Sequence, residues 1–81
     1  MVRIEGGNGS CQDDAIIITD CNNIEGVGQE ITEIKRRFGQ YKLLKQSLLK
    51  IDNRMYDMLT LNINGKEETV YFDITNFFGK F

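Results

Sequence analysis

The stretch LTLNINGKEETVYF, residues 59–72, decides the fold of this chain. The dipeptide Asn64-Gly65 at its centre is the strongest short signal for a β-hairpin, because both central positions of a type I′ turn need positive φ. Polar and apolar side chains alternate on either side of the turn, with the period of two that is typical of strands. Pairing outward from the turn places these residues opposite one another: Ile63 and Lys66, Leu61 and Glu68, Leu59 and Val70, Asp57 and Phe72, Thr60 and Thr69, Met58 and Tyr71, Tyr56 and Asp73.

One face of this hairpin is apolar, and we expect it to lie against a helix. Its residues are Leu59, Leu61, Ile63, Val70, Phe72 and Ile74. A helix is predicted over about residues 24–38, because apolar side chains recur there at spacings of four, three and four positions. Asn23 is a suitable N-cap, and Gly39 follows the last apolar residue, where helices commonly end. The residues of the apolar stripe are Val27, Ile31, Ile34 and Phe38.

Three further segments complete the prediction. Residues 15–19 are a mainly β-branched run between acidic residues, which predicts a short buried strand. Residues 40–51 are compatible with a helix or a strand, and we favour the strand because the run ends at a short turn, Asp52-Asn53-Arg54. The glycine-rich residues 1–12 are predicted to form a flexible N-terminal arm.

The sum is a single α+β domain over residues 13–81, in the order β-α-β-β-β. One helix packs on an antiparallel sheet, and Asp73 or Thr75 caps a short C-terminal helical turn. The chain has 81 residues, which is the length of one domain, and its content of 41% hydrophobic and 27% charged residues is that of a globular protein.

The sequence predicts a cytoplasmic protein that does not cross a membrane. The longest apolar runs, residues 15–18 and 43–44, are far shorter than the roughly 20 residues of a membrane span, and no secretory signal is visible. Cys11 and Cys21 are interpreted as two reduced thiols, because an extended chain between them would hold them too far apart to bond. A looped or intermolecular disulfide is the alternative.

The absence of histidine argues against catalysis by this chain. It excludes Ser-His and Cys-His nucleophiles, and two cysteines alone do not make a zinc site. Gly26 and Gly28 stand where a phosphate loop would stand, but position 31, which needs the third glycine of a dinucleotide fingerprint, is Ile31. We therefore expect no enzymatic activity, no metal and no cofactor.

Charge is segregated along the chain. Residues 1–33 carry a net charge of −6, residues 34–51 carry +6, and residues 52–81 carry −2. The basic segment 35–50 is a candidate anion-binding surface, which makes a small nucleic-acid-binding protein the second hypothesis for function. The alternative is that these cations complement a helix C-terminus and keep a sheet edge soluble. The anion-binding candidates are Lys35, Arg36, Arg37, Lys42 and Lys45.

Aromatic residues gather near the C-terminus and form the leading candidate for an interface. Five of the eight aromatics fall within residues 71–81. The sheet face opposite the helix is expected to show Tyr56, Met58 and Tyr71 near the last phenylalanines, and aromatic and methionine side chains are enriched at interface cores. The interface candidates are Tyr56, Met58, Tyr71, Phe77, Phe78 and Phe81.

The leading hypothesis is therefore a non-catalytic protein-interaction or regulatory module that self-associates as a homodimer, with itself or another protein as its partner. The alternative interpretation of the aromatic residues is that the C-terminal turn simply completes the core. One further residue is unusual. The hairpin register places Asp57 on the apolar face beside Phe72, where a buried carboxylate is either a functional group with a raised pKa or a structural acceptor at the margin of the sheet.

Overall fold

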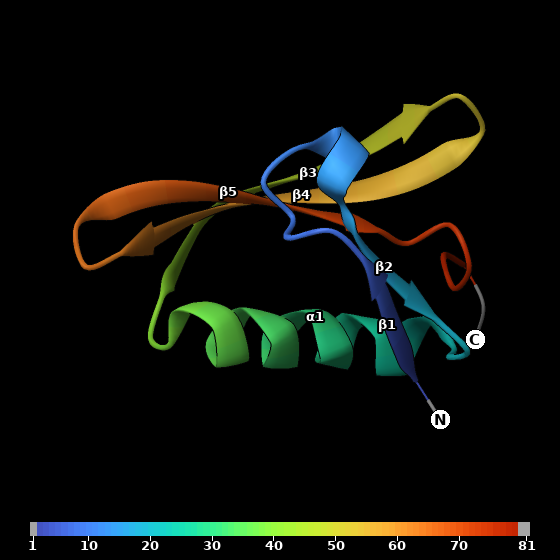
Figure 1. Cartoon of the computed structure of the whole chain (residues 1–81), viewed down its shortest axis with the longest axis horizontal. Helices are drawn as coiled ribbons and strands as arrows, with labels where there is room; N and C mark the ends of the chain where they lie inside the picture. Colours follow the sequence, from blue (N-terminus) through green and yellow to red (C-terminus); the bar gives the residue numbers. More distant parts are fainter. Residues whose placement is uncertain (1, 80–81) are drawn as a thin grey trace.

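The computed structural model describes residues 2–79 and has one helix on one side of a five-stranded sheet. Figure 1 shows α1 below the sheet and the short 3-10 helix η1 on the other side. The predicted α+β class and the order β-α-β-β-β are confirmed, in β2, α1, β3, β4 and β5. The elements are β1 (Arg3–Gly6), η1 (Gln12–Asp14), β2 (Ile16–Thr19), α1 (Asn23–Phe38), β3 (Lys42–Ile51), β4 (Arg54–Ile63) and β5 (Lys66–Asp73).

The β4–β5 hairpin has the register that the turn dipeptide predicts. Every expected pair, from Ile63 with Lys66 to Tyr56 with Asp73, is found. Asn64 and Gly65 have φ of 54° and 86°, as a type I′ turn requires. Residues 42–51 form a strand that pairs antiparallel with β4, so the favoured interpretation of this segment is confirmed.

The sheet differs from the prediction at its other edge. Arg3–Gly6, which lie within the expected flexible arm, form strand β1 and pair antiparallel with β2. Strand β2 pairs parallel with β5, so the sheet is mixed, in the order β1-β2-β5-β4-β3. The sequence RIEG in β1 has little apolar alternation, so the prediction missed a strand that is held in the sheet through its backbone pairing.

The N-cap of helix α1 lies one residue before the predicted cap, Asn23, which is itself the first residue of the helix. Asn22 is the N-cap, and it forms a capping box in which the Asn22 side chain accepts from the Glu25 backbone N–H while the Glu25 carboxylate accepts from the Asn22 N–H. Gly39 ends the helix with φ of 75°, as predicted. No helix in residues 2–79 is long and apolar enough to cross a membrane.

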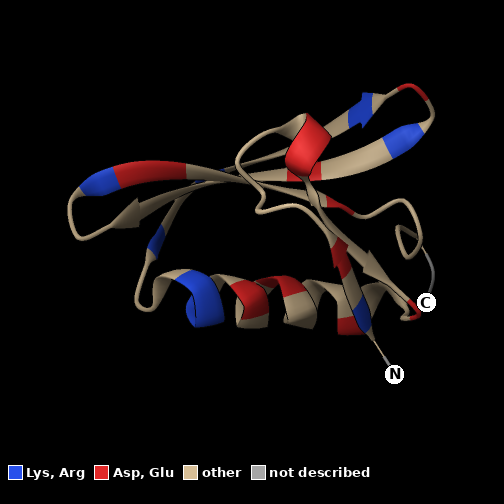
Figure 2. Ribbon diagram, in the orientation of Figure 1, with Lys and Arg blue, Asp and Glu red and all other residues tan. Residues whose placement is uncertain are grey.

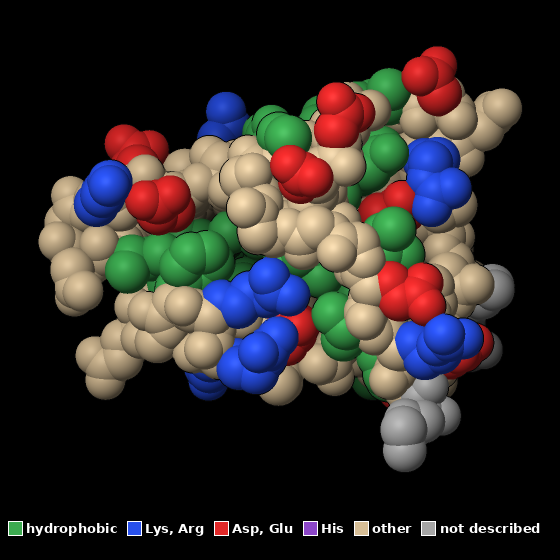
Figure 3. Space-filling model, viewed as in Figure 1, with side chains coloured by type: hydrophobic (Ala, Val, Ile, Leu, Met, Phe, Trp, Pro, Cys, Tyr) green, Lys and Arg blue, Asp and Glu red, His purple; other side chains and the backbone are tan. Residues whose placement is uncertain are grey.

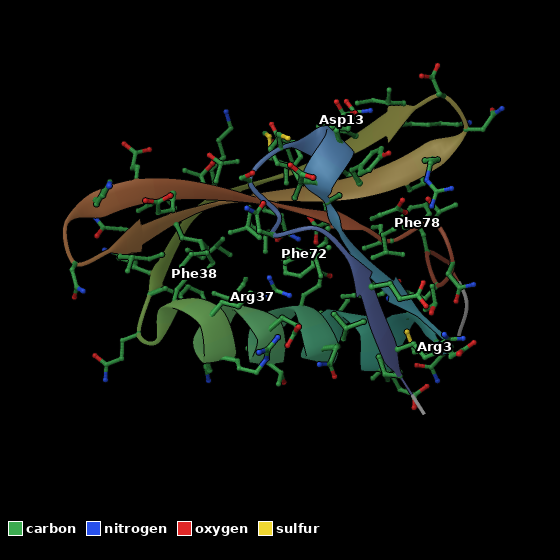
Figure 4. All side chains as sticks on the ribbon, viewed as in Figure 1. Arg3, Asp13, Arg37, Phe38, Phe72 and Phe78 are labelled. Atoms are coloured by element: carbon green, nitrogen blue, oxygen red, sulfur yellow. The ribbon has the colours of Figure 1, made fainter. Side chains whose placement is uncertain are left out.

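The core lies between α1 and the hairpin, as Figure 4 shows for Phe38 and Phe72. Ile34 is buried against this core and Phe38 is packed at its margin, but Val27 and Ile31 are 46% and 43% exposed, so only half of the predicted stripe faces the sheet. The buried core residues are Ile16, Ile18, Ile34, Leu59, Leu61, Val70, Phe72, Ile74 and Phe77. The residues of α1 that are buried are Gly26, Glu30, Glu33 and Ile34.

The absence of a side chain at Gly26 allows α1 to pack closely against the turn that follows β5. A Cβ atom at this position would lie 2.5 Å from the ring of Phe77, which is buried in the turn that follows β5. That turn is closed by the N–H groups of Phe77 and Phe78, both of which donate to the Ile74 carbonyl. The ring of Phe77 therefore packs directly against the helix backbone, and the helix turns its Gly26 side, and not Val27, toward the core.

Two glycines of the same helix give a matched test of this packing. We expect Gly28→Ala to stabilise the protein by about 0.5–1 kcal/mol, because nothing lies within 4 Å of an added Cβ and alanine favours the helix. We expect Gly26→Ala to destabilise it by about 1–3 kcal/mol, because the methyl group collides with a buried ring. Urea denaturation measures both, and equal effects of the two substitutions would contradict the packing described.

Candidate functional site

Helix α1 does not cover strand β3, which is an edge strand of the sheet. An α-helix with its side chains is about 10 Å wide and neighbouring strands are about 4.8 Å apart, so one helix covers about two strands. Among the strands, α1 approaches β2 most closely, and β3 is three positions further along the sheet. Leu43 and Leu48, which share the inner face with Leu61 and Asp57, are consequently 47% and 53% exposed.

A groove runs between α1 and the inner face of β3 and β4. It consists of two adjoining hollows of about 160 Å³ and 370 Å³, which share Val27, Glu30, Gln46 and Asp57 in their walls. The exposed side of α1, with Val27 and Ile31, forms one wall, and β3 forms the other. The remaining lining residues are Asn23, Ile34, Tyr41, Leu43, Leu48, Leu59, Ile74, Phe77 and Phe78.

Two carboxyl side chains meet in this groove. Glu30 of α1 and Asp57 of β4 are 4% and 5% exposed, and they lie within hydrogen-bonding reach of each other. The Gln46 amide, on β3, donates to both carboxylate oxygens of Asp57 at 3.0 Å. No N–H or hydroxyl group of residues 2–79 donates to Glu30 Oε2, which is buried.

Burial decides the protonation of Glu30. Desolvation, followed by the hydrogen bond to Asp57 and the repulsion between the two carboxyl groups, raises the pKa of Glu30 from 4.5 to about 10. At neutral pH Glu30 therefore holds a proton, which it offers to Asp57. Glu30 and Asp57 thus form a carboxyl pair in a groove whose other lining residues are mainly apolar.

The aromatic residues that were predicted to form one exposed patch lie in different parts of the structure. The expectation of an exposed patch is wrong for Tyr56 and Phe77, which are 7% and 1% exposed. Tyr56 is on the rear face, where it lies beside Gln12 and Asp13 of η1, and Figure 4 shows Asp13 on the side of the sheet opposite α1. The ring of Phe77 completes the core, as predicted by the alternative interpretation that the C-terminal turn is part of the core.

The other interface candidates have different surroundings. Met58 and Tyr71 are partly buried on the rear face. Phe78 is 45% exposed and lines the groove on the helix side of the sheet, not the rear face. Phe81 lies outside the described residues. The structure therefore moves the apolar surface from the rear of the sheet to the groove.

The basic segment is divided by an acidic residue of α1. Glu33 is buried, and it accepts hydrogen bonds from Arg36 at 2.8 Å and from Arg37 at 3.5 Å. The hydrogen bonding and charge of Arg36 lower the pKa of the Glu33 carboxyl. Figure 3 shows basic side chains gathered beside acidic atoms over the C-terminal part of α1.

The lysine candidates lie at the edge of this cluster. Lys35 lines a hollow of about 620 Å³ at the C-terminal end of α1, together with Gly39, Gln40 and Tyr41. Lys42 and Lys45 are exposed on β3, and Figure 2 shows the start of this strand close to the basic end of the helix. Because Glu33 engages both arginines, fewer of these cations are available to phosphates than the sequence suggests.

The sequence identified one member of the carboxyl pair and missed the rest of its surroundings. Asp57 is found by the hairpin register, because it is a polar residue on an apolar strand face. Glu30 stands four residues after Gly26 and four before Ile34, a spacing that places it on the same helix face, but only the packing shows that this face is buried. The contact of Gln46 depends on a β-bulge between Leu43 and Lys45, which shifts the register of β3.

Comparisons with known proteins find no matching family model, curated protein or solved structure. Cys11 and Cys21 are not joined in a disulfide. Within residues 2–79, no group of three or more His, Cys, Asp or Glu side chains is placed to hold a metal ion. The groove and its carboxyl pair are thus the candidate site.

The raised pKa of Glu30 predicts a stability that falls as the pH rises. The folded chain keeps a proton that the unfolded chain releases above pH 4.5, so folding becomes less favourable between 4.5 and about 10. The contribution approaches about 1.4 kcal/mol per pH unit. We expect Glu30→Gln to remove it, so that the stability of the variant relative to wild type increases with pH in urea denaturation.

Glu33→Gln is the matched control on the same helix. The pKa of Glu33 is lowered, so its contribution is fully present above pH 4.5 and is lost only as the pH falls below that value. Between about pH 5 and 9, this variant should differ from wild type by a constant amount. A constant difference for Glu30→Gln over the same interval would contradict a buried, protonated Glu30.

Proposed function

We propose that this protein is a non-catalytic protein-interaction module that binds an amphipathic helix of a partner protein in the groove beside α1. The observation that carries the proposal is the apolar inner face of β3, which α1 leaves uncovered. Leu43 and Leu48 on the strand face Val27 and Ile31 on the helix across this groove, and all four side chains are between 43% and 53% exposed. Exposed apolar surface in a concave site is typical of an interaction surface.

A helix is the occupant that fits the geometry. The open inner face of β3 and the exposed Val27 and Ile31 side of α1 are the two surfaces that a bound helix would contact, and the inner face of β4 between them is already buried at Leu59 and Leu61. A helix placed there would pack on the sheet and against Val27 and Ile31, as a second helix does in many two-layer α/β structures. This is recognition of an amphipathic helix by a hydrophobic groove, with apolar side chains of the partner at helical spacings.

The proposal includes self-association, in which the partner protein is a second copy of this chain. A second copy of the chain brings its own exposed apolar side chains, among them Ile24 at 72% and Leu44 at 45% exposure. The rear face of the sheet supports self-association less than the sequence suggested, because Tyr56 and Phe77 are buried. Sedimentation at several protein concentrations distinguishes a groove occupied by a second copy from one that awaits another protein.

Helical peptides of defined pattern test the groove. A displayed library of 16-residue amphipathic peptides, the length of α1, would sample Leu, Ile, Val, Met, Phe, Gln, Lys and Arg at the positions of one face. We expect selection on the wild-type protein to yield helical peptides whose binding is lost in Leu48→Asp, because the new charge lies in the groove.

Leu44→Asp is the matched control for this experiment. Leu44 is on the same strand and is similarly exposed, but it lies at the bulge and lines neither hollow. Binding should survive this substitution. Failure to select any peptide whose binding depends on Leu48 would contradict the proposed function. Submicromolar binding to nucleic acid at about 0.15 M salt would support the basic segment instead.

A further inference from the structure

The floor of the groove has more hydrogen-bond acceptors than donors. Besides the proton that Glu30 holds, the Gln46 amide is the donor from residues 2–79 that reaches this pair, through the two oxygens of Asp57. Glu30 Oε2 is buried and receives no N–H or hydroxyl group from residues 2–79. A buried acceptor without a donor is costly, and its cost is larger where the acceptor is charged.

The groove is the route by which a donor reaches this pair. Glu30 and Asp57 are covered by α1 on one side and by the sheet on the other, and both residues line the two hollows where they adjoin. The walls around them are mainly apolar, and Val27, Ile31 and Leu48 in these walls are between 43% and 53% exposed. A side chain that enters the groove therefore passes apolar surface before it meets the two carboxyl groups.

We propose that the helix bound in this groove presents a lysine or arginine from within its apolar face to Glu30 and Asp57, where the cation supplies the hydrogen-bond donors that the buried Glu30 Oε2 lacks. This inference rests on the proposed function and names the chemistry of the partner. A lysine or arginine has an apolar stem that packs along the walls of the groove and a cationic end that supplies several donors. Hydrogen bonds from a cation to carboxylates are about twice as strong as those between neutral groups.

The exchange has a defined effect on pH dependence. When the cation arrives, Glu30 gives up its proton to solvent, and the cation bonds to the Glu30 carboxylate and to the neighbouring Asp57 side chain. Binding therefore releases a proton, and the affinity for a cationic helix rises with pH up to the raised pKa of Glu30. The titratable groups facing Glu30 in the groove are Asp57 of β4 and, further along, Tyr41, while Gln46 of β3 is uncharged.

The test uses the full chain and the peptide library described above. We expect peptides selected on the wild-type protein to share one lysine or arginine within the apolar face. Replacing that residue by norleucine, which keeps the stem and removes the charge, should weaken binding about tenfold or more at pH 8. The affinity of the cationic peptide should rise between about pH 6 and 8.5, and that of the norleucine peptide should not.

Variants of the protein complete the test. Glu30→Gln keeps the shape of the protonated side chain but has no proton to release, so it should remove the pH dependence. It should reduce the preference for lysine over norleucine without abolishing it, because the Asp57 carboxyl is still present. Glu33→Gln, on the same helix but paired with Arg36, should leave both unchanged. Selected peptides that need Leu48 but carry no cation, or that bind equally well with norleucine, would overturn this inference and leave the proposed function intact. The absence of any peptide that needs Leu48 would contradict the proposed function itself.

Discussion

The width of a single helix is the constraint on which the rest of this structure depends. Five strands are too many for one helix to cover, and α1 lies nearest β2. The apolar residues of β2, β4 and β5 close into a core with Ile34 of the helix, while the inner face of β3 stays open. The groove is therefore a consequence of how the two layers are sized and placed.

The carboxyl pair lies at the boundary between the buried core under α1 and the open groove beside β3. On the closed side, Phe77 packs against Gly26, one helical turn before Glu30. On the open side, Gln46 reaches Asp57 from the uncovered strand. Glu30 is thus buried enough for its protonation to change, and both Glu30 and Asp57 still line a surface that another molecule can reach. Buried polar groups with incomplete hydrogen bonding cost stability, and they give specificity to a partner that completes them.

Local signals in the sequence predict the local parts of the structure. Asn64-Gly65 fixes the β4–β5 register because the turn and the alternation on both sides agree. Strand β1 and the parallel pairing of β2 with β5 escaped prediction, because backbone pairing between distant segments leaves little trace in side-chain pattern. The Val27 and Ile31 half of the helical stripe was expected in the core, and the periodicity could not show that the sheet extends beyond the helix.

The candidate site was predictable only where it touches the hairpin. Asp57 is out of place in an apolar strand pattern and is visible for that reason, whereas Glu30 needs the tertiary contact to become unusual. For the aromatic residues the sequence predicted a site that the structure does not have. Composition cannot distinguish Phe77, which is in the core, from Phe78, which is at a surface.

The central claim is that the groove between α1 and β3 is open in the free protein and is covered when a helix binds. Paramagnetic relaxation of methyl groups by a soluble gadolinium chelate measures this directly, in a sample shown by sedimentation to be monomeric. The account predicts strong relaxation of Val27, Ile31, Leu43 and Leu48, weak relaxation of Ile34 and Leu61, and protection of the first group when a selected peptide is added. Equal protection of both groups in the free monomer, or continued strong relaxation of the first group in the complex, would contradict it.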